Sequence, residues 1–98
     1  MLFALIYNGK SGTEDAEKRS LNIFKNWTPP SGFEFKSHWA FAGTVGGVAI
    51  VEVDSAETML AATAPFQVYN DFTIRAIVDI EAAVPIFDKG YAWRDSVS

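Results

Sequence analysis

The chain has 98 residues, a formal net charge of −4, no cysteine and a single histidine, and 49% of its residues are hydrophobic. No run of Lys and Arg is present to neutralise phosphates, which argues against nucleic-acid binding. Without cysteine, disulfides and thiolate metal sites are excluded, and one histidine cannot build a histidine-rich centre, so we expect neither metal nor cofactor. The length predicts one small domain, residues 1–98. Met1–Tyr7 is too short to span a membrane and lacks the features of a signal peptide, which predicts a soluble, cytoplasmic protein.

Two apolar segments predict strands at the centre of a sheet. Leu2–Tyr7 and Val48–Val53 are apolar almost throughout, which is typical of strands covered on both faces. After the first strand, Gly9-Lys10-Ser11 is similar to the end of a phosphate-binding loop. The glycine expected further upstream is missing, which favours a plain loop.

A first helix is predicted over residues 13–27. Acidic residues open it and Lys25 lies near its end, an order that suits the helix dipole, and Ser11 or Thr13 can cap it. Side chains recurring at a spacing of three to four residues predict its buried face: Ala16, Ser20, Ile23, Phe24 and Trp27.

A second helix is predicted over residues 55–62, directly after the second apolar strand. Asp54 can cap it, and Glu57 can complete a capping box. Pro65 interrupts this helix and predicts a further short turn through Tyr69.

Two other segments alternate between apolar and polar residues and predict edge strands. In Phe33–Phe41, the apolar set predicted to lie under the helices is Phe33, Phe35, Trp39 and Phe41, whereas Glu34, Lys36 and His38 point the other way. A short hairpin connects this strand to the central one, where Gly46 and Gly47 predict a bulge, or else a point where another backbone or a ligand comes close. Phe72–Asp79 alternates in the same manner.

The resulting order, β-α-β-β-α-β, predicts an α+β, ferredoxin-like fold with a four-stranded antiparallel sheet and both helices on one face. We expect the opposite face, with Tyr7, Val48 and Ile50, to be too apolar for water and to be covered by a second copy in a homodimer. The tail, from about residue 81, predicts a short helix ended by Gly90. Its aromatic residues, Tyr91 and Trp93, are expected to pack on the body or on the partner subunit.

These features resemble the dimeric α/β-barrel superfamily over about residues 1–90. The residues that carry the resemblance are the strand Val48–Val53 running into Asp54-Ser55-Ala56-Glu57, and the ending Val78-Asp79-Ile80-Glu81. Within that superfamily the chain is most similar to a small bacterial domain family of unknown function. Other branches include cofactor-independent monooxygenases, lactone isomerases and haem enzymes, whose sites lie in a cleft beside the bare sheet face. None of their catalytic motifs matches this chain.

Four side chains are candidates for a binding site in such a cleft. His38 is suited to act as a general base or to orient a carbonyl, unless it is simply a solvated edge residue. Arg75 is suited to bind a carboxylate, or else to pair with Glu52 or Asp79. Glu52 is an acid/base candidate if buried, and otherwise a half-solvated residue at the end of its strand. Tyr7 can present its hydroxyl at the pocket mouth or anchor the core.

Three functions remain open from the sequence. The first is a homodimer that binds a small apolar or carboxylate-bearing ligand through Tyr7, His38, Glu52 and Arg75. The second is a cofactor-independent monooxygenase-like or isomerase-like enzyme with His38 as its catalytic base. The third is a purely structural or regulatory dimer.

Overall fold

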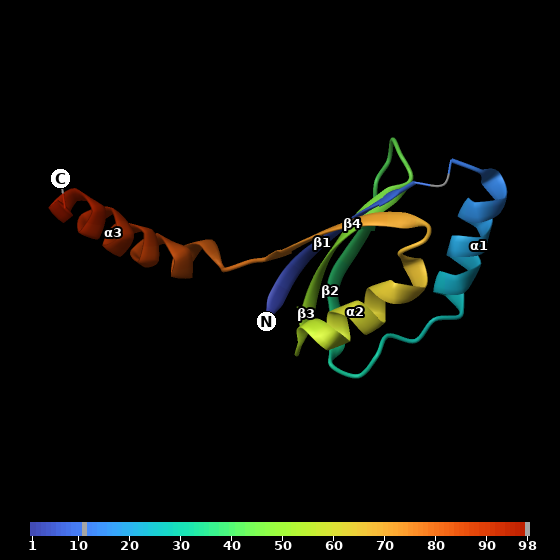
Figure 1. Ribbon diagram of the computed structural model, residues 1–98, viewed down its shortest axis with the longest axis horizontal. Helices are drawn as coiled ribbons and strands as arrows, with labels where there is room; N and C mark the ends of the chain where they lie inside the picture. The colour runs from blue at the N-terminus through green and yellow to red at the C-terminus, as the bar shows by residue number, and fades with distance from the viewer. Residues whose placement is uncertain (11, 98) are drawn as a thin grey trace.

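The computed structural model describes residues 1–10 and 12–97. Its elements are β1 (Leu2–Gly9), α1 (Glu14–Lys25), β2 (Phe33–Ala40), β3 (Gly46–Val53), α2 (Ala56–Thr63), the 3₁₀ turn η1 (Ala64–Phe66), β4 (Asn70–Ala76) and α3 (Ile80–Val97). The sheet is antiparallel with the order β2-β3-β1-β4, so the two apolar strands are central and the two alternating strands are edges, as predicted (Figure 1). This is the ferredoxin-like arrangement of an α+β domain.

The core lies between the sheet and α2. It consists of Leu5, Phe33, Ala49, Val51, Val53, Met59 and Ala62, all less than a tenth exposed. The cap of α2 differs from the prediction, because Ser55 and not Asp54 is the capping residue: its Oγ accepts a hydrogen bond from the backbone N–H of Thr58 at 3.1 Å. The turn predicted at Pro65 is confirmed as η1.

Helix α1 lies on the same side of the sheet but is less tightly packed. Its cap is Thr13, whose Oγ1 accepts from the N–H of Ala16 at 3.3 Å, while Ser11 lies outside the described residues. Of the predicted stripe, Ala16, Ser20, Phe24 and Trp27 line a cavity against the sheet, yet no residue of α1 is buried and Phe24 remains 41% exposed. The expectation of a buried face is therefore wrong, because a cavity separates this helix from the sheet.

Strand β2 contains a β-bulge that the alternation pattern does not predict. Phe35 pairs with Val51 and Ser37 pairs with Ile50, which leaves Lys36 as an extra residue. Beyond the bulge every side chain changes face relative to the prediction. His38 pairs with Ala49 on the helix-covered face, and Trp39 lies on the opposite face, 59% exposed. The predicted placement of Trp39 under the helices is wrong.

Gly46 and Gly47 do not form a bulge, because the ladder between β1 and β3 runs through them without a shift. They mark a close approach instead, which was the alternative prediction. At Gly46, φ is +144°, a conformation that favours glycine, and a Cβ there would collide with the carbonyl oxygen of Tyr7.

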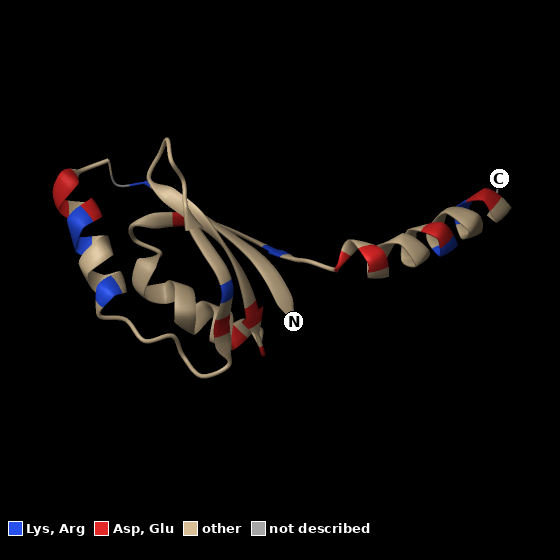
Figure 2. Ribbon diagram, turned by 180° about the vertical axis from the view of Figure 1, so that it is seen from behind, with Lys and Arg blue, Asp and Glu red and all other residues tan. Residues whose placement is uncertain are grey.

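The sheet face away from α1 and α2 is called the bare face here. Its apolar residues are Leu2, Ala4, Ile6, Trp39, Val48 and Ile50, and Thr73 and Arg75 lie on the same face of β4. Tyr7 is not among them, since it pairs with Gly47 on the helix-covered face, which corrects its expected position. Acidic residues also lie on the bare face, since Glu34 pairs with Glu52 and Asp71 pairs with Asn8. The view from behind shows acidic and basic residues on the strands (Figure 2).

The tail differs most from its prediction. Helix α3 continues through Pro85 and Gly90 to Val97, and it extends away from the body (Figure 1). Tyr91 is 51% exposed and Trp93 is 70% exposed, so neither packs on the body of its own chain. Across residues 1–10 and 12–97, no helix has the length and apolar character needed to cross a membrane.

Candidate ligand-binding site

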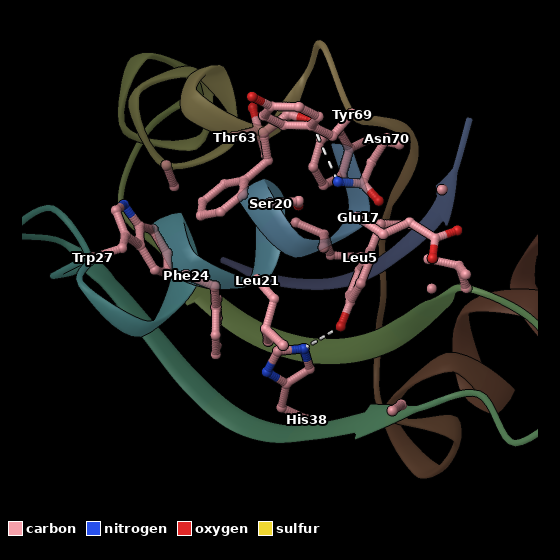
Figure 3. A pocket seen from close by; sticks show the side chains of 18 of the residues that line it. Leu5, Glu17, Ser20, Leu21, Phe24, Trp27, His38, Thr63, Tyr69 and Asn70 are labelled. Carbon is pink, nitrogen blue, oxygen red and sulfur yellow. Dashed lines mark hydrogen bonds between the residues drawn. The ribbon is translucent and has the colours of Figure 1, made fainter. Parts of the chain in front are cut away.

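A cavity of about 410 Å³ lies between α1, the α2–η1 segment and the helix-covered face of the sheet (Figure 3). Its wall is rich in aromatic residues, among them Tyr7, Phe24, Trp27, Phe33, Phe35, Phe66, Tyr69 and Phe72. Leu21 and Phe24 extend from α1 towards His38 in this view. A volume of several hundred Å³ with an apolar wall is typical of small-molecule sites.

Tyr7 and His38 form a hydrogen-bonded pair in the wall of this cavity. The Tyr7 hydroxyl lies 2.7 Å from Nε2 of His38, although the two residues belong to strands on either side of β3. Gly47 makes the approach possible, because a Cβ at that position would lie 2.5 Å from the Tyr7 hydroxyl oxygen. The absence of a side chain on the intervening strand thus allows the tyrosine ring to cross it.

Aromatic rings surround the imidazole of His38. It stacks on Phe35 with the ring centroids 4.7 Å apart and the planes at 3°, and it meets Phe24 edge-on at 5.7 Å. Burial among these groups lowers the pKa of His38 and raises the pKa of Tyr7, since both shifts favour the neutral form. At neutral pH the site therefore holds a neutral imidazole against a neutral phenol.

A few polar groups complete the wall. Thr63 is buried, and its hydroxyl donates to the carbonyl oxygen of Met59 at 3.0 Å while accepting from the amide of Gln67 at 3.2 Å. The Asn70 side-chain amide donates to the carbonyl oxygen of Phe66 at 3.4 Å. Of the lining residues within the described part of the chain, Glu17 is the only one with a carboxylate, and none is Lys or Arg.

The structure brings together two of the four predicted site residues and separates the other two from them. Tyr7 and His38 meet on the helix-covered face, whereas Glu52 and Arg75 lie on the bare face. Glu52 is near the end of β3, 47% exposed, and its Oε1 lies 2.8 Å from the amino group of Met1. No carboxylate in the described ranges lies within ion-pair distance of Arg75, so its predicted pairing with Glu52 or Asp79 is wrong.

Sequence reasoning missed the residues that shape the cavity around His38. Phe35 and Phe24 were assigned only to the core, and Gly47 was interpreted first as part of a bulge. The signal was present in the pair of glycines, which also predicted a close approach. Metal ligands are not clustered: within residues 1–10 and 12–97, no group of three or more His, Asp or Glu side chains is placed to hold a metal ion.

The fold and the cavity define a small α+β domain with a ferredoxin-like sheet and an aromatic pocket beneath its helices. The chain belongs to the DUF3303 family, a domain of unknown function, which it matches over residues 1–91. No match was found among the curated proteins.

Proposed function

We propose that this domain binds a small, uncharged and largely apolar molecule in the cavity beneath α1. The observation that carries the proposal is the Tyr7–His38 pair, held at 2.7 Å in the wall of an aromatic cavity of about 410 Å³. An apolar wall with a few polar groups that fix orientation is the usual construction of a ligand site. Here the Tyr7 hydroxyl and the His38 imidazole are the groups that can form hydrogen bonds with a bound ligand.

The incomplete packing of α1 supports an occupant. Leu21 is 54% exposed and Phe24 is 41% exposed, although both line the cavity. Exposure of these apolar side chains to water costs free energy in proportion to the exposed area. A bound apolar molecule would cover them and hold α1 against the sheet.

The charges at the site favour a neutral ligand over a carboxylate. Glu17 would repel an anion, and Arg75, the cation expected to bind a carboxylate, lies across the sheet on the bare face. An anion buried without a cationic partner is strongly disfavoured. A phenol-like or carbonyl-bearing aromatic molecule fits the wall better.

Paired probes with one ring system test this proposal. 2-Naphthol and its anionic counterpart 2-naphthoate are titrated into the ¹⁵N-labelled protein and followed by NMR. We expect 2-naphthol to shift resonances of the cavity residues and to bind at least tenfold more tightly than 2-naphthoate. Loss of one hydrogen bond in Tyr7→Phe is expected to weaken 2-naphthol binding by about three- to tenfold.

The matched control is Tyr91→Phe on α3, which removes the same hydroxyl at a distance from the cavity and should leave binding unchanged. Equal affinity for the two probes would contradict the preference for a neutral ligand. If 2-naphthol does not bind at millimolar concentration, the domain is better described as a purely structural or regulatory dimer.

A second candidate function, a cofactor-independent enzyme with His38 as base, is favoured by the same hydrogen bond. A neutral imidazole at 2.7 Å from a phenol hydroxyl is placed to take a proton from that hydroxyl, or from a ligand phenol in its position. Oxygen uptake with 1,4-dihydroxynaphthalene tests it. Enzymatic uptake should exceed the uncatalysed rate and disappear in His38→Gln, and a rate equal to that of buffer alone would reject this candidate.

We further propose a homodimer through the bare face, as in the dimeric α/β-barrel superfamily that the chain resembles. Val48 and Ile50 are only half-buried in the single chain, and Trp39 is exposed beside them. Contiguous apolar surface of this kind is typical of an interface. Light scattering at micromolar concentration should give twice the mass of one chain, and a monomer would contradict the proposal.

A further inference from the structure

Helix α3 has no packing partner in its own chain. None of its 18 residues is buried, and seven large apolar side chains on it are about half exposed or more: Ile80, Val84, Ile86, Phe87, Tyr91, Trp93 and Val97. The molecule is 58 Å long with a Cα radius of gyration of 17.4 Å, against about 13 Å for a compact domain of this length. Pro85 and Gly90 weaken this helix by about 3 and about 1 kcal/mol, and most helical stability in proteins comes from packing.

The apolar residues of α3 lie on one half of the helix. At 100° per residue, Ile80, Val84, Phe87 and Tyr91 fall on one line, and Ile86, Trp93 and Val97 fall on a second line about 130° away around the helix. Ala83, Gly90 and Arg94 lie between the two lines. The opposite half carries Glu81, Asp88, Lys89 and Asp95. Phe87 and Tyr91 stack with their centroids 6.1 Å apart, which makes a continuous aromatic surface. The helix is thus built to pack along one side.

The connection to β4 directs the helix away from its own body (Figure 1). Ile77 follows β4 and is still hydrogen-bonded to β1, since its N–H donates to the carbonyl oxygen of Leu2 at 3.0 Å. Two residues later, Asp79 caps the helix by accepting from the N–H of Glu81 at 2.9 Å. Only Val78 separates Ile77 from the helix cap, so the helix continues outward from the end of β4 (Figure 1).

The surface area that a dimer can bury indicates that the partner of α3 is a second copy of the chain. Three of the strands have eight residues, so one sheet face measures about 26 by 19 Å and two faces together bury about 1,000 Å². That is the lower limit for a specific interface, whereas stable ones bury about 1,200–2,000 Å². The apolar half of one 18-residue helix adds about 400 Å². With the matching area that each helix covers on the other copy, two such helices raise the total to about 2,600 Å², within the range of obligate dimers.

We propose that α3 is an exchanged arm: in a dimer formed through the bare faces, the apolar half of each α3 packs against the other copy of the chain. This inference rests on the homodimer proposed above and extends it from the sheet to the C-terminal helix. The arm completes an interface that the sheets alone leave near its minimum size.

Three full-length variants, each with one new glutamate, test the arm. Phe87→Glu places the charge on the apolar half of α3, Ala92→Glu places it on the opposite half, and Ile50→Glu places it on the bare face. Sedimentation equilibrium measures the dimer dissociation constant of each. We expect Phe87→Glu to raise it at least tenfold, Ala92→Glu to change it less than twofold, and Ile50→Glu to give monomers.

Hydrogen exchange of residues 80–97 in the same proteins distinguishes the alternatives. The amides of α3 should be protected in the wild-type dimer and lose protection in Phe87→Glu and in the Ile50→Glu monomer. Protection retained in that monomer would mean that α3 folds back on its own chain, and it would overturn the exchange. An unchanged dissociation constant for Phe87→Glu, with dimers still lost in Ile50→Glu, would overturn the arm and leave the sheet dimer intact. Binding of 2-naphthol to Phe87→Glu reports separately on the cavity.

Discussion

At the scale of single residues, the candidate site depends on Gly47, which has no side chain to separate Tyr7 from His38. Tyr7 and His38 lie on strands that do not pair with each other, and their contact crosses β3 at Gly47. Any larger residue there would occupy the space of the tyrosine ring. The glycine therefore contributes to the site by removing an obstacle, without touching a ligand.

We expect Gly47→Ala to break the Tyr7–His38 hydrogen bond. The new Cβ would collide with the carbonyl oxygen of Trp39, and it would lie 2.5 Å from the Tyr7 hydroxyl oxygen and 2.8 Å from the ring carbon that bears it, so both the ring and the β2 backbone must shift. Overpacking of this kind costs about 1–3 kcal/mol of stability. Urea unfolding gives the cost, and the NMR signals of Tyr7 and His38 report the contact. Signals like those of the wild type would show that the ring crosses β3 elsewhere.

The pH dependence of His38 gives a second prediction at this scale. Its pKa is lowered in the folded state, so the unfolded chain binds the proton more readily. Stability should therefore fall as the pH drops below about 6.5, the pKa of an unperturbed histidine, and level off below the folded pKa. Above pH 7 the histidine contributes no pH dependence.

His38 is the only histidine, so one ¹H resonance reports its titration. Phe35→Ala removes the stacked ring and should move the pKa back towards about 6.5. Phe87→Ala, which removes a ring from α3, should leave it unchanged. Denaturant midpoints for the wild type and His38→Gln at pH 7.5 and pH 5 test the stability claim, and parallel shifts in the two proteins would contradict it.

At the scale of elements, the sequence predicted the strands and the first two helices to within a few residues. These elements follow from local patterns: apolar runs, spacing along a helix, caps and turn residues. The face of each β2 residue was predicted only as far as Phe35. Alternation has a period of two, and one extra residue reverses it without leaving a mark in composition. His38 and Trp39 exchanged faces for that reason.

The bulge makes a specific prediction for the deletion of Lys36. Without this residue, Phe35 and Ser37 become neighbours that already pair with adjacent positions on β3, so the strand becomes regular and no side chain changes face. We expect the variant to fold with a stability within about 1 kcal/mol of the wild type, since the bulge residue is unpaired. Deletion of Val51, which is fully buried, serves as the destabilising control.

Urea unfolding and the His38 titration check this outcome. A variant with its His38 pKa still lowered would support the assignment of Lys36 as the extra residue. A return of that pKa towards the unperturbed range would mean that the deletion moved His38 out of the cavity and that the bulge lies elsewhere.

At the scale of the whole molecule, the sheet separates the four site residues that were predicted to lie together. Tyr7, His38, Glu52 and Arg75 were expected on one face, but the first two face the helices and the last two do not. The helix in the tail is also longer than predicted, because it was expected to end at Gly90. In a helix interior a proline costs about 3 kcal/mol and a glycine about 1 kcal/mol, yet α3 continues through both.

Trp39 provides the most direct test of what covers the bare face. The side chain is 59% exposed in the single chain, so Trp39→Ala should change the unfolding free energy of the monomer by about 1 kcal/mol or less. Covered by a second copy, an interface tryptophan is typically worth about 2 kcal/mol or more, which corresponds to a dimer dissociation constant raised about thirtyfold.

Trp27→Ala is the matched control. That tryptophan packs against Phe66 at 5.3 Å and Phe33 at 6.0 Å, so its loss should cost about 2–3 kcal/mol of unfolding free energy and leave association unchanged. Sedimentation equilibrium and urea unfolding, both over a range of protein concentrations, separate the two effects, since dimer stability depends on concentration. If Trp39→Ala associates like the wild type, the partner does not cover β2, and the pairing must be shifted towards β1 and β4.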